Sequence, residues 1–212
     1  MNPFAFLRRK RSVEQLLREG RRSELQELVP IYPALDLALP AQDQDYPRAI
    51  SLKADGLGAY LLDMHLSPKH LAQIEQLIEH LGFRRKPQTV SFETFSREGT
   101  SSESEAVSIQ KEALGNGTSL LLVSNSIELL QSLPDLVPPL PWDVFPEVDA
   151  DGLGALQGSL EYWWNHYWWP YWNSLSPQQR TDWLNNTSHP ESWREYIQLQ
   201  STLNGIELGT QA

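Results

Sequence analysis

The sequence contains no cysteine and no long hydrophobic run. Without cysteine the chain forms no disulfide and has no thiol nucleophile or thiol metal ligand. The best candidates for a membrane span, residues 57–62 and 120–123, fall far short of the roughly 20 residues that a helix needs to cross a bilayer. The basic cluster 8–11 follows a short apolar patch, the reverse of a secretory signal. We therefore expect a soluble, cytoplasmic protein.

Motifs that mark common catalytic and metal sites are also missing. The chain has no G-x-S-x-G, no phosphate-binding G-x-x-x-x-G-K-[ST], no dinucleotide-binding glycine motif after a strand, and no H-E-x-x-H. Asp149 and Asp151 begin like a calcium loop, but aligning Gly152 to its sixth position leaves Gly158 where the closing glutamate belongs. We therefore predict no catalytic residue, no metal site and no cofactor.

Positive charge is scarce in the second half of the chain. Residues 120–212 carry two Arg and no Lys against eleven Asp and Glu, a net charge of −9, whereas residues 1–30 carry a net charge of +3. An acidic surface repels nucleic-acid phosphates and anionic membranes. The charge therefore argues against a nucleic-acid ligand and favours a basic partner.

Tryptophan is absent from the first 141 residues, and all eight lie between Trp142 and Trp193. A run of prolines precedes this change in composition and is typical of an extended connector. These shifts divide the chain into a basic N-terminal helical segment (1–30), a mixed α/β lobe (31–133), a proline-rich connector (134–146) and a Trp-rich helical lobe (147–212). The predicted fold class is α+β, with a small sheet in the first lobe.

Periodicity and capping residues predict the elements of the first lobe. Residues 12–29 read as two short helices broken at Gly20, and residues 47–66 as two strands joined by a turn at Asp55-Gly56. Ser67-Pro68 opens a helix whose leucines and isoleucines recur at helical spacing as far as Gly82. Further strands are predicted at 89–95 and 120–123, separated by an exposed polar stretch at 97–105, and Asn125 is the predicted cap of a following helix.

The second lobe reads as helices only. Residues 153–172 form one predicted helix that ends around Pro170. Ser176, with Gln179 at capping-box spacing, opens the next helix, and Ser188 opens a third across Pro190.

Aromatic rings dominate the first of these helices. At 100° per residue the rings between residues 162 and 172 point to every side, so a single small core cannot hold them all. One interpretation packs this helix between the other helices and the α/β lobe. The other makes it a protein-binding surface, since Trp and Tyr commonly anchor interfaces. The candidate anchors are Trp163, Trp164, Trp168, Trp169 and Trp172, with Asp149, Asp151 and Glu161 steering the partner.

The sequence therefore favours a non-enzymatic acidic protein that binds a basic partner protein. Bacterial immunity proteins and antitoxins share these properties, as an analogy of composition only. Two alternatives stay open. One is an enzyme or small-ligand binder with an aromatic-walled pocket between the lobes, using His166 beside Asp149 and Asp151. The other is a structural subunit that self-associates through the aromatic helix.

Overall fold

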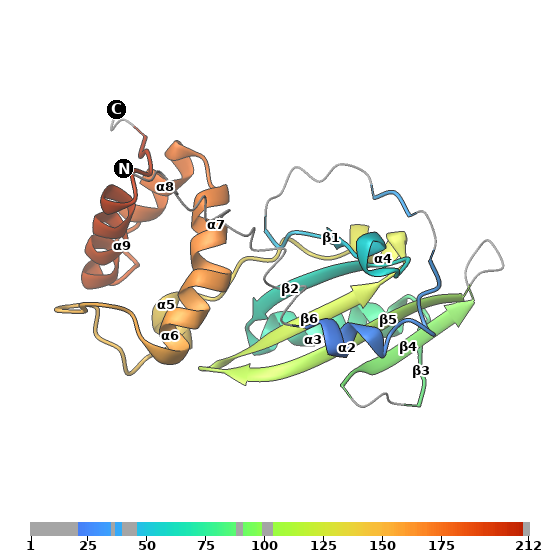
Figure 1. Cartoon of the computed structure of the whole chain (residues 1–212). Coiled ribbons are helices and arrows are strands. Elements are labelled where there is room, and N and C mark those ends of the chain that lie inside the picture. The colour runs from blue at the N-terminus through green and yellow to red at the C-terminus, as the bar shows by residue number, and fades with distance from the viewer. Residues whose placement is uncertain (1–20, 35–36, 40–45, 88–90, 99–103, 210–212) are drawn as a thin grey trace, which may run out of the picture.

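The protein combines an antiparallel sheet with a group of helices at one end of that sheet (Figure 1). The computed structural model describes residues 21–34, 37–39, 46–87, 91–98 and 104–209. The predicted α+β class is confirmed, and so is the helical character of the second lobe. Of the helices predicted at 12–29, residues 12–20 lie outside the described residues, and the described part contains α2 (Arg22–Gln26).

Six strands form the sheet, and every neighbouring pair is antiparallel. In the order in which they pair, they are β1 (Ile50–Ser51), β2 (Tyr60–Leu66), β6 (Gly117–Ser124), β5 (Ser104–Leu114), β4 (Glu93–Glu98) and β3 (Arg84–Arg85). The predicted strand pair around Asp55-Gly56 is present as β1 and β2, and Gly56 takes the positive φ of 80° that the turn requires.

Two strand predictions need correction. Strand β4 begins at Glu93, later than expected, and continues through Glu98 into the stretch that looked like a loop. Strand β5 was not predicted at all, because its first residues and its C-terminal half are polar. Only its middle residues, among them Val107 and Ile109, are buried, so the alternation of the whole strand is weak.

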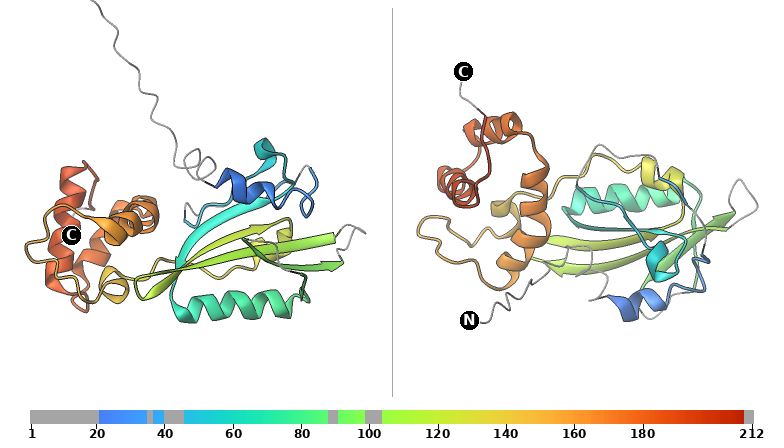
Figure 2. Two further views of the ribbon diagram at one scale, coloured as in Figure 1. Left: turned by 60° about the horizontal axis from the view of Figure 1, so that its bottom comes forward. Right: turned by 45° about the horizontal axis from the view of Figure 1, so that its top comes forward.

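Helices cover both faces of the sheet (Figure 2). Helix α3 (Pro68–His80) and the short α4 (Ile127–Gln131) pack on one face. The opposite face is covered by α2 (Arg22–Gln26) and the turn after it, where Leu28 and Tyr32 are fully buried. The Tyr32 hydroxyl lies 2.9 Å from the carbonyl oxygen of Val123, which ties this turn to the centre of the sheet.

Local hydrogen bonds explain where α3 and α4 begin. The Ser67 side chain accepts the backbone N–H of His70 at the start of α3, as the sequence predicts. Helix α4 is capped by Ser126, not by the predicted Asn125. The side-chain oxygen Oδ1 of Asn125 instead accepts a hydrogen bond from the backbone N–H of Ala106 at 2.7 Å. The Asn125 side chain therefore binds the neighbouring strand β5.

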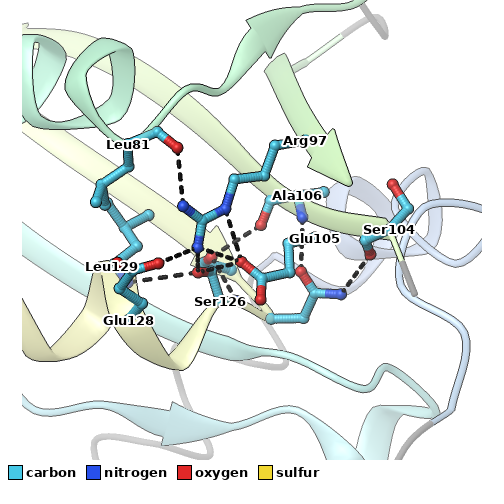
Figure 3. Close-up of polar contacts among 10 residues, drawn as sticks. Leu81, Arg97, Ser104, Glu105, Ala106, Ser126, Glu128 and Leu129 are labelled. Atoms are coloured by element: carbon cyan, nitrogen blue, oxygen red, sulfur yellow. Dashed lines mark hydrogen bonds and ion pairs between the residues drawn. The ribbon is translucent and has the colours of Figure 1, made fainter. Parts of the chain in front are cut away.

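Arg97 joins the ends of four elements on this side of the sheet (Figure 3). Its guanidinium donates to Glu105 of β5, to Glu128 of α4 and to the carbonyl of Leu81 after α3. It also lies 4.7 Å from the centre of the Phe83 ring. Because Arg97 is bound on every side by protein groups, we assign this cluster a structural role.

The helical lobe begins with α5 (Pro141–Val144) and ends with α9 (Glu191–Leu203). Between them lie α6 (Gly158–Trp163), a π-helical turn (Trp164–Trp168), α7 (Trp169–Ser174) and α8 (Pro177–Asn185). Helix α8 opens with the predicted capping box of Ser176 and Gln179. Helix α9 starts directly after Pro190 instead of being capped by Ser188.

The helix predicted at residues 153–172 has other ends in the structure than in the prediction. It begins at Gly158 and runs through Pro170 to Ser174. Proline normally interrupts a helix because it has no N–H and crowds the carbonyl four residues earlier. Here the preceding turn is wider, since the Trp169 N–H reaches the carbonyl of Trp164 five residues back. This π turn lets the helix pass the proline.

Candidate ligand-binding site

Four of the five predicted anchor rings lie inside the protein. Trp163, Trp164, Trp168 and Trp172 are each at most 3% exposed. Trp169 is partly exposed and stacks on Trp164, while the carboxylates of Asp149, Asp151 and Glu161 face solvent. The packing interpretation therefore describes the buried rings, and a partner surface made of them would require the helical lobe to open.

The junction between the lobes is built around His65 of strand β2. Its Nδ1 accepts the indole N–H of Trp163 at 3.0 Å, and its Nε2 lies 3.0 Å from the carbonyl oxygen of Leu114. These two contacts are compatible with a neutral ring that carries its proton on Nε2. Burial lowers the pKa of His65, which keeps the ring neutral.

A second polar group at the junction centres on Asp63, two residues earlier on the same face of β2. Its Oδ1 accepts the hydroxyl of Tyr167 at 3.0 Å, and that hydroxyl is 2.7 Å from Ser119 Oγ. Its Oδ2 is buried and has no hydrogen-bond partner among the described residues. Burial raises the pKa of Asp63, an effect that the charge of Arg21 opposes.

The sequence analysis did not single out Asp63 or His65. A signal for them was available, because they occupy alternate positions of an otherwise apolar strand. Two polar residues on one face of a buried strand need polar partners on whatever covers that face. The partners, Tyr167 and Trp163, come from residues about a hundred positions later.

Removing the Tyr167 hydroxyl is expected to destabilise this junction. Tyr167→Phe leaves Asp63 without its remaining hydrogen bond, which is expected to lower the free energy of unfolding by about 1–3 kcal/mol. Tyr171→Phe is the matched control, because the Tyr171 hydroxyl makes no hydrogen bond within the described residues. Urea unfolding of both variants measures the difference. Equal losses would show that the Tyr167–Asp63 contact contributes nothing.

A groove of about 610 Å³ lies between the two lobes, on the side of the sheet end where α3 begins. Ser67, His70 and Asn116 line it from the α/β lobe, and the prolines of the connector, Pro138 and Pro139, also contribute. Tyr171, Trp183 and His189 form its wall on the helical lobe. The groove thus joins residues that are more than a hundred positions apart.

Aromatic rings in contact with one another form the helical wall. The His189 ring centre lies 4.3 Å from that of Trp183 and 5.2 Å from that of Trp142, and both pairs of rings are tilted. Its Nδ1 is 3.2 Å from the carbonyl oxygen of Trp183, and its Nε2 is 3.3 Å from the Asn186 amide nitrogen. Burial lowers the pKa of His189, so its ring presents a neutral aromatic surface.

His166, the residue predicted to supply a polar group to such a pocket, lies elsewhere. His166 stacks on Tyr162 with ring centres 4.1 Å apart, and its Nδ1 lies 2.8 Å from the carbonyl oxygen of Tyr162. Neither His166 nor the predicted Asp149 and Asp151 line the groove. The sequence predicted a pocket between the lobes, and the groove found there is lined by polar residues other than the ones it named.

Comparison with known proteins finds no matching protein family, no matching curated protein and no matching solved structure. Within the part of the chain that the structure describes, no cluster of His, Asp and Glu has the make-up of a metal site. The same part contains no helix with the length and apolar character needed to span a membrane.

Proposed function

We propose that the protein binds a small, ring-containing organic ligand in the groove between its lobes. The observation that carries this proposal is the aromatic wall formed by Trp183 and His189, whose ring centres lie 4.3 Å apart. Ligand sites typically have volumes of about 300–1,000 Å³, mostly apolar walls and a few polar groups, and they often lie between domains. The groove, at about 610 Å³, meets each of these conditions.

The predicted basic protein partner stays a prediction. The acidic charge of residues 120–212 supports it, but the buried rings do not supply its anchors. The same holds for self-association through the aromatic helix, because most of its rings already pack within one chain. A groove that is open in the monomer needs no such rearrangement, and this makes it the better supported site.

A neutral fluorescent probe tests the proposal. N-phenyl-1-naphthylamine carries a phenyl ring and a naphthalene ring system and brightens when it leaves water, so it is expected to bind wild-type protein saturably. Val137 lines the groove and is 43% exposed, so Val137→Arg places a long charged side chain there. We expect this variant to weaken probe binding at least tenfold, about 1.4 kcal/mol.

The matched control is Val29→Arg. Val29 is 46% exposed but belongs to the segment that covers the other face of the sheet. It should leave probe binding unchanged, and circular dichroism checks that both variants are folded. Absence of saturable binding to the wild type, or equal weakening by both variants, would refute the groove as the binding site.

A further inference from the structure

We propose that the ligand of this groove is an organic cation, recognised by the carboxylate of Asp143 together with the aromatic wall. This inference rests on the proposed function, because it names the chemical class that the same groove selects. Three features of the groove support it: the carboxylate in its lining, the aromatic side chains that line it, and the absence of Lys and Arg among the described lining residues.

The lining carries one formal negative charge and no formal positive charge. Asp143 is exposed on α5 and lines the groove. Among the described residues that line it, none is Lys or Arg. His189 adds no charge, since burial lowers the pKa of its ring. A cation entering the groove therefore meets a carboxylate without competition from a side-chain cation in the lining.

The wider field of the protein acts in the same direction. Asp143 belongs to residues 120–212, which carry a net charge of −9. A cleft lined by one sign of charge raises the local concentration of oppositely charged ligands. The net negative charge of this part of the chain favours the approach of cations over that of anions, against the positive charge of Arg194, which donates to the carbonyl of His189.

The face of an aromatic side chain can bind a cation as well as an apolar ring. A cation over the face of Trp or Tyr is attracted by the negative charge density of the ring. Trp183 and Tyr171 both line the groove, and the Trp183 ring is in contact with that of His189. Rings beside a carboxylate are thus suited to an ammonium group attached to an apolar body.

The groove offers few hydrogen-bond donors to an anion among its described residues. The groove includes the start of α3, but the Ser67 side chain already accepts the N–H of His70. Pro68, the first residue of that helix, has no N–H to offer. The Asn116 amide, which makes no side-chain hydrogen bond within the described part of the chain, is a neutral group that can orient a polar ligand of either kind.

Three probes with one ring system separate charge from shape. Tryptamine is a cation at pH 8, 3-methylindole is neutral and indole-3-propionate is an anion. Each is titrated against protein loaded with N-phenyl-1-naphthylamine, at low salt. We expect tryptamine to displace the dye with an affinity at least about tenfold higher than that of indole-3-propionate, with 3-methylindole between them.

Two variants then test which carboxylate is responsible for the binding of the cation. Asp143→Asn is expected to weaken tryptamine binding about fivefold or more and to leave 3-methylindole unchanged. Glu147→Gln removes one negative charge from an exposed residue nearby that does not line the groove, so it should change neither probe appreciably.

The outcomes distinguish the two proposals. If the dye binds and Val137→Arg blocks it, but the three indoles bind equally or the anion binds best, the cation inference is wrong while the proposed function stands. If Glu147→Gln weakens tryptamine as much as Asp143→Asn does, the preference arises from overall charge and the assignment to Asp143 is wrong. If the dye does not bind at all, both proposals fail.

Discussion

Replacing Trp168 with alanine is expected to lower the free energy of unfolding by about 3–5 kcal/mol. Trp168 is completely buried and stacks on Trp163 and Trp172, with ring centres 5.9 Å and 6.1 Å away. It also meets the Trp183 ring edge-on at 5.4 Å. Removing the indole leaves a cavity at the centre of the lobe, which neighbouring rings cannot fill without shifting. Urea unfolding followed by circular dichroism measures the loss.

Trp169→Ala is the control for this change. Trp169 follows directly in sequence, but it is partly exposed and stacks on Trp164. Its replacement is expected to cost about 1 kcal/mol, because the site can be filled by water. If Trp168→Ala were as mild as Trp169→Ala, the buried-core assignment would fail. The interpretation of these rings as anchors for a partner would then regain support.

Acidification is expected to weaken the junction between the lobes through His65. The pKa of His65 is lower in the folded protein than the ordinary value of about 6.5. Its contribution to stability is therefore complete above that ordinary value, and it is lost as the pH falls toward the folded pKa. Within this window the free energy of unfolding falls by up to about 1.4 kcal/mol per pH unit. Protonation puts an N–H on Nδ1, where the Trp163 N–H now donates.

Asp63 has the opposite dependence. Burial raises its folded pKa, so its neutral form is the favoured one in the fold. The resulting contribution is present below the ordinary carboxyl value of about 3.9 and is lost as the pH rises through the folded pKa. The two residues thus act in opposite directions, and a wild-type profile alone does not isolate His65.

A non-titrating variant isolates it. His65→Gln retains an amide that can donate to the carbonyl of Leu114 and accept from Trp163, but it binds no proton in this range. Urea unfolding at intervals between pH 7.5 and 5 should show a flatter decline for this variant than for the wild type. His80→Gln measures the effect of removing an exposed imidazole at the end of α3. A slope change no larger than that of His80→Gln would contradict the role of His65.

The candidate site was predictable only in outline. Aromatic residues crowded behind a proline-rich connector indicated a pocket between two lobes, and such a groove is present. Its helical wall, however, is formed by Tyr171 together with Trp183 and His189 from the later part of the lobe, and His166 does not line it. Ring direction along a helix depends on its exact path, and here a π turn shifts the register just before Pro170.

The sequence by itself determined the elements whose causes are local. Ser67 and Pro68 begin α3, Ser176 and Gln179 begin α8, and the apolar runs at 57–62 and 120–123 lead into or lie within strands β2 and β6. Each signal lies within a few residues of the structure that it produces, through a cap, a turn or a repeating apolar face.

Tertiary structure alone decided which polar groups meet and which rings are buried. Strand β5 is stabilised by pairing with β4 and β6 on either side, despite its polar ends. Asp63 and His65 lie in the junction only because Tyr167 and Trp163 cover them. Such contacts join residues far apart in the chain, so their energy depends on how the lobes dock and not on any local pattern.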